Sequence, residues 1–310
     1  TINGMASAFG ESVLRINPSM NIALLLTVNI VAIPMSIAFG RLADKTSTKF
    51  ALLLALGIYC AVAITAVGFA PLELDPTEDH DGYDFQYDWS EADSEYKLST
   101  LYDRGVDGWV SESGDGDAAF RNAYLDYLNM GSLTAAQAAE FSGSAFNETS
   151  HRFSVHFEDG PLDNIDVVGD QHPTMLDQGG PMDWWPETMR DNVWQPLGIT
   201  VSLQWIILGV FVGVVMGAAG AQARSMFTML IPESRTTEFF GFFGFIGKAA
   251  AMIGPILYAL SVALFDSRVA IMSIVVLIVA GSWLCSRVDL EEGIRVAAEE
   301  DARARAEAEN

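Results

Sequence analysis

The stretch Gly220–Pro255, GAQARSMFTMLIPESRTTEFFGFFGFIGKAAAMIGP, decides the fold of this chain. It contains a polar turn around Glu233 and Arg235, and a long apolar run lies on each side of that turn. Runs of roughly 20 apolar residues are long enough for an α-helix to cross the hydrocarbon core of a bilayer. The stretch therefore predicts two consecutive membrane-spanning helices joined by a short polar connection.

Working outward, the same pattern recurs along the chain. Pro34 inside the first run is compatible with a span if neighbouring helices satisfy the freed backbone carbonyl. We therefore predict an all-α polytopic membrane protein. The expected spans are Met20–Phe39, Phe50–Ala70, Leu197–Ala221, Phe239 to about Leu260, and Val269–Cys285.

The acidity of the chain is concentrated in one segment. The formal net charge is −23, and residues 71–195 contain 27 acidic residues against 5 basic ones. The remainder has 13 acidic and 12 basic residues and is nearly neutral. Such acidity argues against binding to nucleic acid, which requires a basic surface. We interpret residues 71–195 as an acidic, soluble insert between two groups of membrane helices.

The insert has the pattern of a small α+β domain. Phe85, Tyr87 and Trp89 alternate as in a strand, and Phe153, Val155 and Phe157 do so more clearly. An Asp159-Gly160 turn and the apolar residues that follow suggest a hairpin. Thr134 is expected to cap a helix that continues to Phe141. A further helix is predicted over Ala118–Met130, with Phe120, Tyr124, Leu125 and Leu128 on one face.

Basic residues give the orientation. The turn after the first span, the connection at Arg224 and Arg235, and the tail after the last span carry most of the bases outside the insert. With five spans, these three sites fall on one side, and the positive-inside rule makes that side cytoplasmic. The insert and residues 1–19 are then expected outside, and the tail inside. Cys60 and Cys285 lie in apolar runs and are interpreted as buried thiols rather than a disulfide.

Two motifs resemble a known family. Gly40–Lys49, GRLADKTSTK, resembles the G-x-L-A-D-[RK]-x-G-x-[KR] loop of the major facilitator superfamily, with Ser47 where the pattern has glycine. The stretch from Gln222 to Pro255 resembles the vacuolar amino-acid effluxer family of autophagy and its bacterial relatives. The matching residues are Gln222, Arg224, Ser225, Ile231-Pro232, Glu238-Phe239-Phe240-Gly241, Gly247-Lys248 and Gly254-Pro255, and the tail VDLEEGIRVA fits as well.

The resemblance implies the carboxy-terminal six-helix half of a facilitator, with its first helix truncated. Residues 1–70 would hold the end of helix seven plus helices eight and nine. Residues 71–195 are the insert, residues 196–287 would hold helices ten to twelve, and residues 288–310 form a charged cytoplasmic tail. The opening TINGMASAFGE has no signal-peptide pattern, and we expect the chain to begin near the end of a membrane helix. The partner implied is the amino-terminal half of the same transporter.

The resemblance also implies roles for charged residues. The turn residues Gly40, Arg41, Asp44, Lys45 and Lys49 would latch the cytoplasmic side during rocking of the two halves. Asp44 would accept hydrogen bonds from the start of the helix near Thr237–Phe239, where the helix dipole favours a carboxylate. An ordinary solvated turn is the alternative.

Arg224, Arg235 and Glu238 are candidates for a cytoplasmic gate. Arg235 and Glu238 would pair with Arg41 or Lys45 across the membrane face, and a solvated helix start explains them nearly as well.

Lys248 is the most informative charge, because it lies about 10 residues past Glu238 and hence ~15 Å along a helix. An ammonium near mid-membrane faces a cavity or a partner acid by default. Lys248 is therefore a candidate to bind substrate or a coupling site, and a structural pair with a carboxylate of the absent half is the alternative. Asn29, Gln204 and Gln222 are further pathway candidates, for which interhelical hydrogen bonds are the alternative.

Glycines in the spans are expected to serve helix packing. Gly213 and Gly217 form a GxxxG pair that lets another helix approach closely. We place Gly241, Gly254 and Pro255 in the same class.

Catalytic and metal chemistry find little support in the sequence. The four histidines, His80, His151, His156 and His172, lie in the insert with many acids, including Asp79, Asp81 and Asp170. Their spacing fits no zinc or calcium pattern, and Asp115 and Asp117 lack the EF-hand spacing. We expect no metal, no cofactor and no enzyme.

The predicted function is secondary active transport of a small metabolite, by analogy an amino acid leaving the compartment, through alternating access without ATP. Its partners would be the lipid bilayer, a small-molecule substrate and a coupling ion, and its location a bacterial inner membrane. The alternative is a membrane-anchored sensor whose acidic insert recognises an extracytoplasmic ligand.

Overall fold

The computed structural model describes residues 9–10, 13–14, 16, 18–76, 82–101, 130–144, 151, 153–177 and 179–308. These residues fall into two compact units. The helical unit comprises the described parts of 1–69, 179–189 and 201–310, and the sheet unit those of 70–178 and 190–200. Residues 179–189, which the sequence places in the insert, thus pack with the helices.

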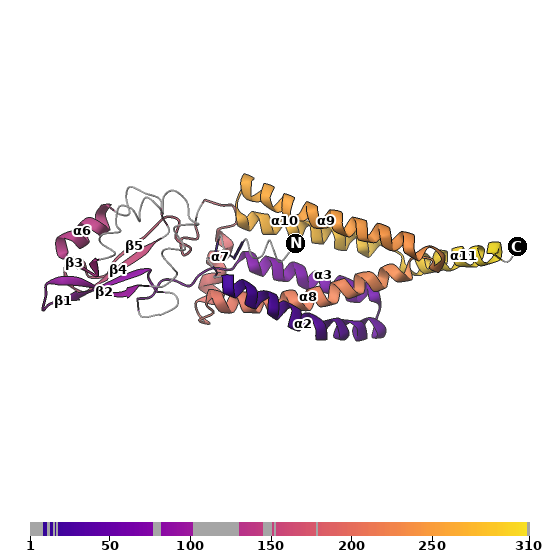
Figure 1. Ribbon diagram of the computed structural model, residues 1–310, viewed down its shortest axis with the longest axis horizontal. Helices are drawn as coiled ribbons and strands as arrows, with labels where there is room; N and C mark the ends of the chain where they lie inside the picture. Colours follow the sequence, from indigo (N-terminus) through magenta and orange to yellow (C-terminus); the bar gives the residue numbers. More distant parts are fainter. Residues whose placement is uncertain are drawn as a thin grey trace. The chain divides into compact units, whose positions relative to one another are not determined.

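Five helices of the helical unit are long and apolar enough to cross a membrane. Figure 1 shows them running side by side. Helix α8 packs against α2 and α3, α3 also packs against α10, and α10 packs against α9. Their bounds are α2 Pro18–Lys45, α3 Thr48–Val67, α8 Val201–Met229, α9 Thr236–Leu264 and α10 Ser267–Arg287.

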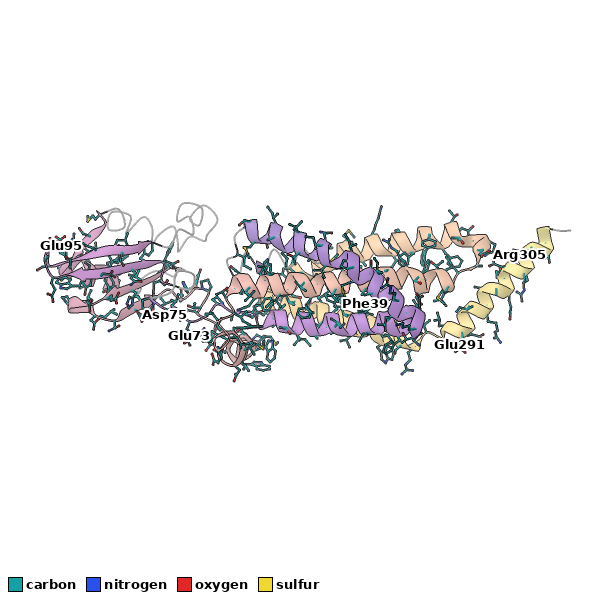
Figure 2. All side chains as sticks on the ribbon, turned by 90° about the horizontal axis from the view of Figure 1, so that it is seen from below. Phe39, Glu73, Asp75, Glu95, Glu291 and Arg305 are labelled. Atoms are coloured by element: carbon teal, nitrogen blue, oxygen red, sulfur yellow. The ribbon has the colours of Figure 1, made fainter. Side chains whose placement is uncertain are left out.

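Shorter elements complete this unit. The 3-10 turn η3, Glu233–Arg235, separates α8 from α9. Helix α7, Trp184–Met189, precedes α8 along the chain. The charged tail forms helix α11, Leu290–Ala308. Figure 2 labels Glu291 near the start of this helix and Arg305 near its end.

The helices pack closely where glycine removes the side chain. A Cβ built on Gly213 would lie 2.8 Å from the Val28 carbonyl oxygen, and one on Gly217 would lie 2.2 Å from that of Ala32. The GxxxG pair thus lies where α8 comes close to α2, an approach for which small residues are needed. By contrast, a Cβ on Gly241 or Gly220 meets nothing within 4 Å.

The sheet unit contains one five-stranded sheet in the order β3-β2-β1-β4-β5. Strands β1 and β4 are parallel, and the other neighbours are antiparallel. The strands are β1 Phe85–Ser90, β2 Glu95–Leu101, β3 Ser132–Thr134, β4 Ser154–Glu158 and β5 Ile165–Val168, and helix α6 is Ala135–Ser144. A π-helical turn, η2 at Arg190–Trp194, also belongs to this unit.

The predicted strands and the β4–β5 hairpin are confirmed. Thr134 caps α6, since its Oγ1 accepts a hydrogen bond from the Gln137 N–H. The helix predicted over Ala118–Met130 lies outside the described residues, apart from Met130. Both faces of β4 are buried, including Ser154 and His156, although its alternating pattern is typical of a strand with one wet face.

Aromatic side chains form the core of the sheet unit. The Tyr87 and Phe157 rings stack with centroids 5.4 Å apart, and Phe141 of α6 meets Tyr87 edge-on. Burial of these large rings offsets the repulsion among the acids of the surface. The buried members are Phe85, Tyr87, Tyr96, Leu133, Ala138, Phe141, Phe153, Val155 and Phe157.

We predict that Gly217→Ala lowers the stability of the helical unit by about 1–3 kcal/mol, because the new methyl group overlaps a backbone carbonyl of α2 that cannot rotate away. The matched control is Gly220→Ala on the same helix, where the methyl group meets open space. Thermal unfolding of both variants in detergent measures the difference. Equal stability of the two variants would contradict the close α2–α8 contact.

Candidate functional site

Three polar segments meet at one end of the helical unit, which we call the turn end. They are the α2–α3 turn, the α8–α9 turn and the start of α11. Thr48 Oγ1 at the start of α3 donates to Met229 Sδ at the end of α8, 3.7 Å away. The predicted placement of the three base-bearing sites at one end is thus found, whereas the membrane side that it faces stays a prediction.

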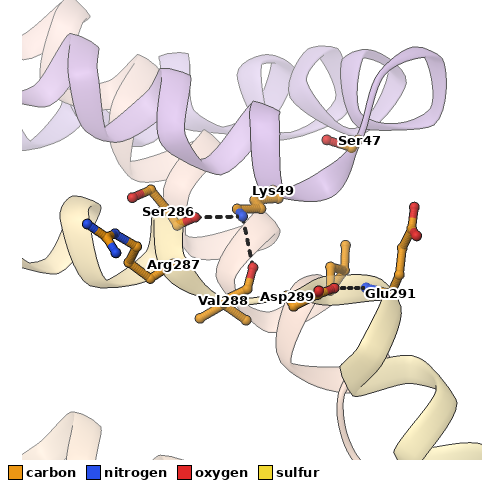
Figure 3. A pocket seen from close by; sticks show the side chains of 8 residues that line it. Ser47, Lys49, Ser286, Arg287, Val288, Asp289 and Glu291 are labelled. Carbon is orange, nitrogen blue, oxygen red and sulfur yellow. Dashed lines mark hydrogen bonds between the residues drawn. The ribbon is translucent and has the colours of Figure 1, made fainter.

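Lys49 joins the α2–α3 turn to the end of α10. Its Nζ donates hydrogen bonds to the carbonyl oxygens of Ser286 and Val288, both at 2.8 Å (Figure 3). The last carbonyls of a helix lack intrahelical donors and carry partial negative charge, so an ammonium there satisfies both needs. A shallow open pocket surrounds this contact. It is lined by Ser47, Lys49, Ser286, Arg287, Val288, Asp289, Leu290 and Glu291.

Other residues of the predicted latch face solvent. Arg41, Asp44 and Lys45 are exposed, and in the described part of the chain they make no ion pair or side-chain hydrogen bond. Gly40 has open space at its Cβ position. Ser47, at the glycine position of the motif, adopts an extended backbone and caps α3 by accepting from the Phe50 N–H. Serine is therefore compatible with this turn.

The α8–α9 turn is held by the tail helix. The Asp301 carboxylate accepts hydrogen bonds from the N–H groups of Glu233 and Ser234 at 2.9 and 3.0 Å. The sequence assigned a comparable role to Asp44, which makes no such bond in this structure. Hydrogen bonds from the Ser234 and Glu233 N–H groups lower the pKa of Asp301. These hydrogen bonds stabilise the contact between α11 and the turn at pH above the ordinary carboxyl pKa of about 4. They are lost as the pH falls through the lowered pKa of Asp301.

The gate candidates differ from their predicted pairing. Arg235 pairs with Glu300 of α11 at 3.7 Å, not with a residue of the α2–α3 turn. The other two candidates, Glu238 and Arg224, are exposed, and neither has an ion pair among the described residues. The physical reason is that Arg235 is a base and needs an acidic partner, which α11 supplies as Glu300.

The pathway candidates divide between two helix pairs. Lys248 is exposed near the middle of α9, and the described residues give it no ion pair. Asn29 on α2 is exposed and donates to the Leu25 carbonyl 2.7 Å away. Gln204 and Gln222 are buried in α8. Because α2 packs on α8 whereas α9 packs on α10, this structure does not gather the four into one site. Gly254 and Pro255 lie beyond Lys248 on α9.

Arg268 is a buried charge that the sequence analysis did not single out. It is 7 % exposed and its Nη1 donates to the carbonyl oxygens of Val67 and Phe69, the latter at 3.0 Å. The Asp183 and Asp266 carboxylates interact with it electrostatically. A sequence signal did exist, because an arginine in the first turn of a helix opposes the helix dipole and so calls for a specific partner.

Trp185 of α7 contributes to the same contact region. Its Nε1–H donates to the Ile64 carbonyl at 2.9 Å, and a Cβ at Gly68 would lie 2.8 Å from that nitrogen. Asp266 caps α10 through the N–H groups of Arg268 and Val269. The last turn of α3 is thus closed by an arginine and a tryptophan from two other segments.

In the sheet unit, two histidines pair with carboxylates. His156 Nδ1 lies 2.5 Å from Asp166 Oδ1, and the Tyr83 ring stacks on the imidazole. Burial and the nearby Asp166 raise the pKa of the Tyr83 hydroxyl. His172 Nε2 lies 3.4 Å from Asp84 Oδ2, which also accepts from Ser154.

Metal ligation finds no counterpart in the described residues, where no three metal-ligating side chains converge. His80, Asp79, Asp81, Asp115 and Asp117 lie outside the described part of the chain. Cys60 and Cys285 are both free thiols, as predicted, but both are half-buried rather than buried.

We predict that Lys49→Met lowers the stability of the helical unit by about 1 kcal/mol, because two helix-terminal carbonyls lose a charged donor at a solvent-accessible site. Lys45→Met, four residues earlier on the exposed turn, is the control and is expected to unfold at the unchanged temperature. Differential scanning fluorimetry in detergent measures both. An unchanged midpoint for Lys49→Met would show that the contact does not stabilise the fold.

A larger effect is expected for Arg268→Met. Removal of one member of a buried ionic cluster leaves the other charges uncompensated and costs roughly 3–5 kcal/mol. Arg287→Met, at an exposed arginine over the Trp283 ring, removes the same charge from the other end of α10 and serves as the control. Thermal unfolding compares the two variants, and a smaller shift for Arg268→Met than for its control would refute the capping role.

Comparison with known proteins covers the region of α7 to α11. Residues 187–298 match the family described as "Vacuole effluxer Atg22 like". The chain is 36% identical over 67 residues to autophagy-related protein 22 of Candida glabrata, which covers 22% of this chain and 12% of that protein. It is 33% identical over 101 residues to the uncharacterized MFS-type transporter YxiO of Bacillus subtilis, covering 32% of this chain and 24% of that protein.

A third relative, autophagy-related protein 22 of Kluyveromyces lactis, is 35% identical over 72 residues, which are 23% of this chain and 15% of that protein. No solved structure matches the chain. The matches span at most about a quarter of the length of these relatives. Together with the five apolar helices, they confirm that the chain resembles the Atg22-like effluxers of the major facilitator superfamily and is a multi-pass membrane protein.

Proposed function

We propose that the chain is the carboxy-terminal half of a secondary transporter that moves a small metabolite across a membrane by alternating access. The observation that carries the proposal is the family match over α7 to α11, which includes the α8–α9 turn and Lys248. The matched family is described as vacuole effluxers, and one relative is named as an MFS-type transporter. Efflux of an amino acid, coupled to an ion gradient, is the finer form of the proposal.

The arrangement of the helices supports a transporter in which α3 and α10 stay fixed relative to each other while α9 moves. Helices α3 and α10 are joined at both ends by Lys49 and Arg268, which favours a rigid pair. Helix α9 packs mainly on α10 and is otherwise almost entirely exposed. In a facilitator, such a surface would face the amino-terminal half and the pathway between the halves.

Lys248 supports a polar pathway. It lies at the thirteenth position of the 29-residue α9, so that its depth is near the middle of the span. A charged group at this depth is costly unless it faces water, substrate or an acid. A small molecule with a carboxylate, such as an amino acid, is the class of substrate that an ammonium would bind.

The proposed location is a bacterial inner membrane, with the turn end in the cytoplasm and the sheet unit outside. The positive-inside distribution of Arg41, Lys45 and Lys49 supports this orientation. The lipid bilayer and an amino-terminal half are the partners that the proposal requires.

The decisive experiment reconstitutes the complete protein in liposomes without ATP and measures uptake of a panel of radiolabelled amino acids under an imposed proton or sodium gradient. Replacing residues 77–177 by a flexible linker tests the sensor alternative, because this deletion spares Trp185 and the helical unit. Gradient-driven flux that survives the deletion supports the carrier. Absence of flux from the intact protein under every gradient would overturn the proposal.

We predict that Lys248→Met lowers transport by about tenfold or more, since loss of one charged hydrogen-bond partner costs roughly 1.5–3 kcal/mol. Lys248→Arg keeps the charge and is expected to retain part of the activity. Lys97→Met, on the surface of the sheet unit, removes a lysine far from the spans in sequence and is the control. Initial rates in proteoliposomes give the answer, and full activity of Lys248→Met would exclude a pathway role.

A further inference from the structure

Helix α11 presents one continuous face to the α8–α9 turn. Its less exposed residues recur every three or four positions, which places them on one side of a helix. Gly293 lies against this turn, since a Cβ there would be 2.3 Å from Leu230 Cδ2. One turn further on, Ala297 is buried. The face consists of Leu290, Gly293, Ala297, Glu300, Asp301 and Ala304.

Polar contacts continue this face beyond the apolar ones. Asp301 binds the N–H groups of Glu233 and Ser234, Glu300 pairs with Arg235, and Arg305 pairs with Glu233 at 3.5 Å. Asp301 is an anion at backbone N–H groups that precede a helix, which is a favourable position for a carboxylate. In the pairs Arg235–Glu300 and Glu233–Arg305, the turn and α11 each contribute one acid and one base.

The position of α11 matters because the α8–α9 turn, which it contacts, connects to α9. The α8–α9 turn leads directly into α9, which packs on α10 and η3 and whose Phe240 and Phe243 rings also meet the Phe227 ring of α8. The turn also carries Arg235, one of the gate candidates. A helix that occupies this turn therefore restrains the start of the least-packed span.

We propose that α11 is a reversible clamp, which docks along the α8–α9 turn and holds the start of α9 in place. The docking itself stands on the contacts above, and its effect on transport rests on the proposed function. Undocking of α11 would free Arg235 and the turn, so that the rate of α9 movement depends on the tail. Exposed ion pairs are individually weak and are screened by salt, which suits a contact that opens and closes.

Backbone hydrogen exchange tests the docking without any substrate. Asp301→Ala removes the acceptor of the Glu233 and Ser234 N–H groups, and we expect exchange of peptides covering 231–238 to accelerate by about fivefold, as for one net hydrogen bond lost. Glu307→Ala removes a negative charge from the same helix outside the docking face and also introduces alanine, so it is the control. Equal exchange in the two variants would overturn the clamp.

A charge swap tests the ion pairs by a second route. Arg305→Glu alone is expected to accelerate exchange of the same peptides, and adding Glu233→Arg is expected to restore slow exchange. Both residues are exposed, so the variants keep the core intact. Failure of the second substitution to rescue the first would refute the pairing.

An engineered disulfide between α11 and the α8–α9 turn tests whether docking of α11 restrains transport. In a Cys60→Ala, Cys285→Ala background of the complete protein, Leu230→Cys and Gly293→Cys are expected to cross-link under copper phenanthroline. Cross-linking should lower the uptake measured with the amino-acid panel, and dithiothreitol should restore it. No cross-link refutes docking, and unchanged uptake after cross-linking refutes restraint. If the uncross-linked protein moves none of the panel, the proposed function fails, while hydrogen exchange still decides the docking.

Discussion

The reciprocal capping of α3 and α10 is the constraint on which the helical unit depends. Lys49 at the start of α3 binds the last carbonyls of α10, and Arg268 at the start of α10 binds those of α3. Carbonyls at a helix end have no intrahelical hydrogen-bond donor, and near a membrane few other donors are available to them. The two bases satisfy these groups at opposite ends, and so fix both the antiparallel direction and the register of the pair.

The other helices are arranged around this pair with unequal freedom. On one side, α8 approaches α2 so closely that Gly217 has no room for a methyl group. On the other side, α9 exposes Gly241 and Lys248 and is held at its start by the tail helix. Tight packing and reciprocal caps resist movement more than the sparser packing of α9, which rests mainly on α10 and on the contacts of its Phe240 and Phe243 rings with Phe227 of α8. This contrast is the physical basis for assigning the moving role to α9.

The sheet unit solves a different problem, because it carries nearly all of the net negative charge of the chain. Its stability comes from stacked aromatic rings on one face of the sheet and from buried polar pairs on the other. In one of these pairs Asp84 accepts a hydrogen bond from Ser154, and His172 Nε2 lies 3.4 Å from the same carboxylate. The repulsion among surface acids falls as ionic strength rises.

The sequence by itself determined the five spans, the strands β1, β4 and β5, the Thr134 cap and the family resemblance, because each follows from local periodicity or from a contiguous motif. It did not predict β2 and β3. Only the tertiary structure decided the partners of the charges. In the structure, Arg235 pairs with Glu300 rather than with the α2–α3 turn. Lys49 binds carbonyl oxygens at the end of α10, and Arg268 binds those at the end of α3. Such pairs join residues far apart in the chain, and their formation depends on which helix ends meet in space. No local pattern records that information.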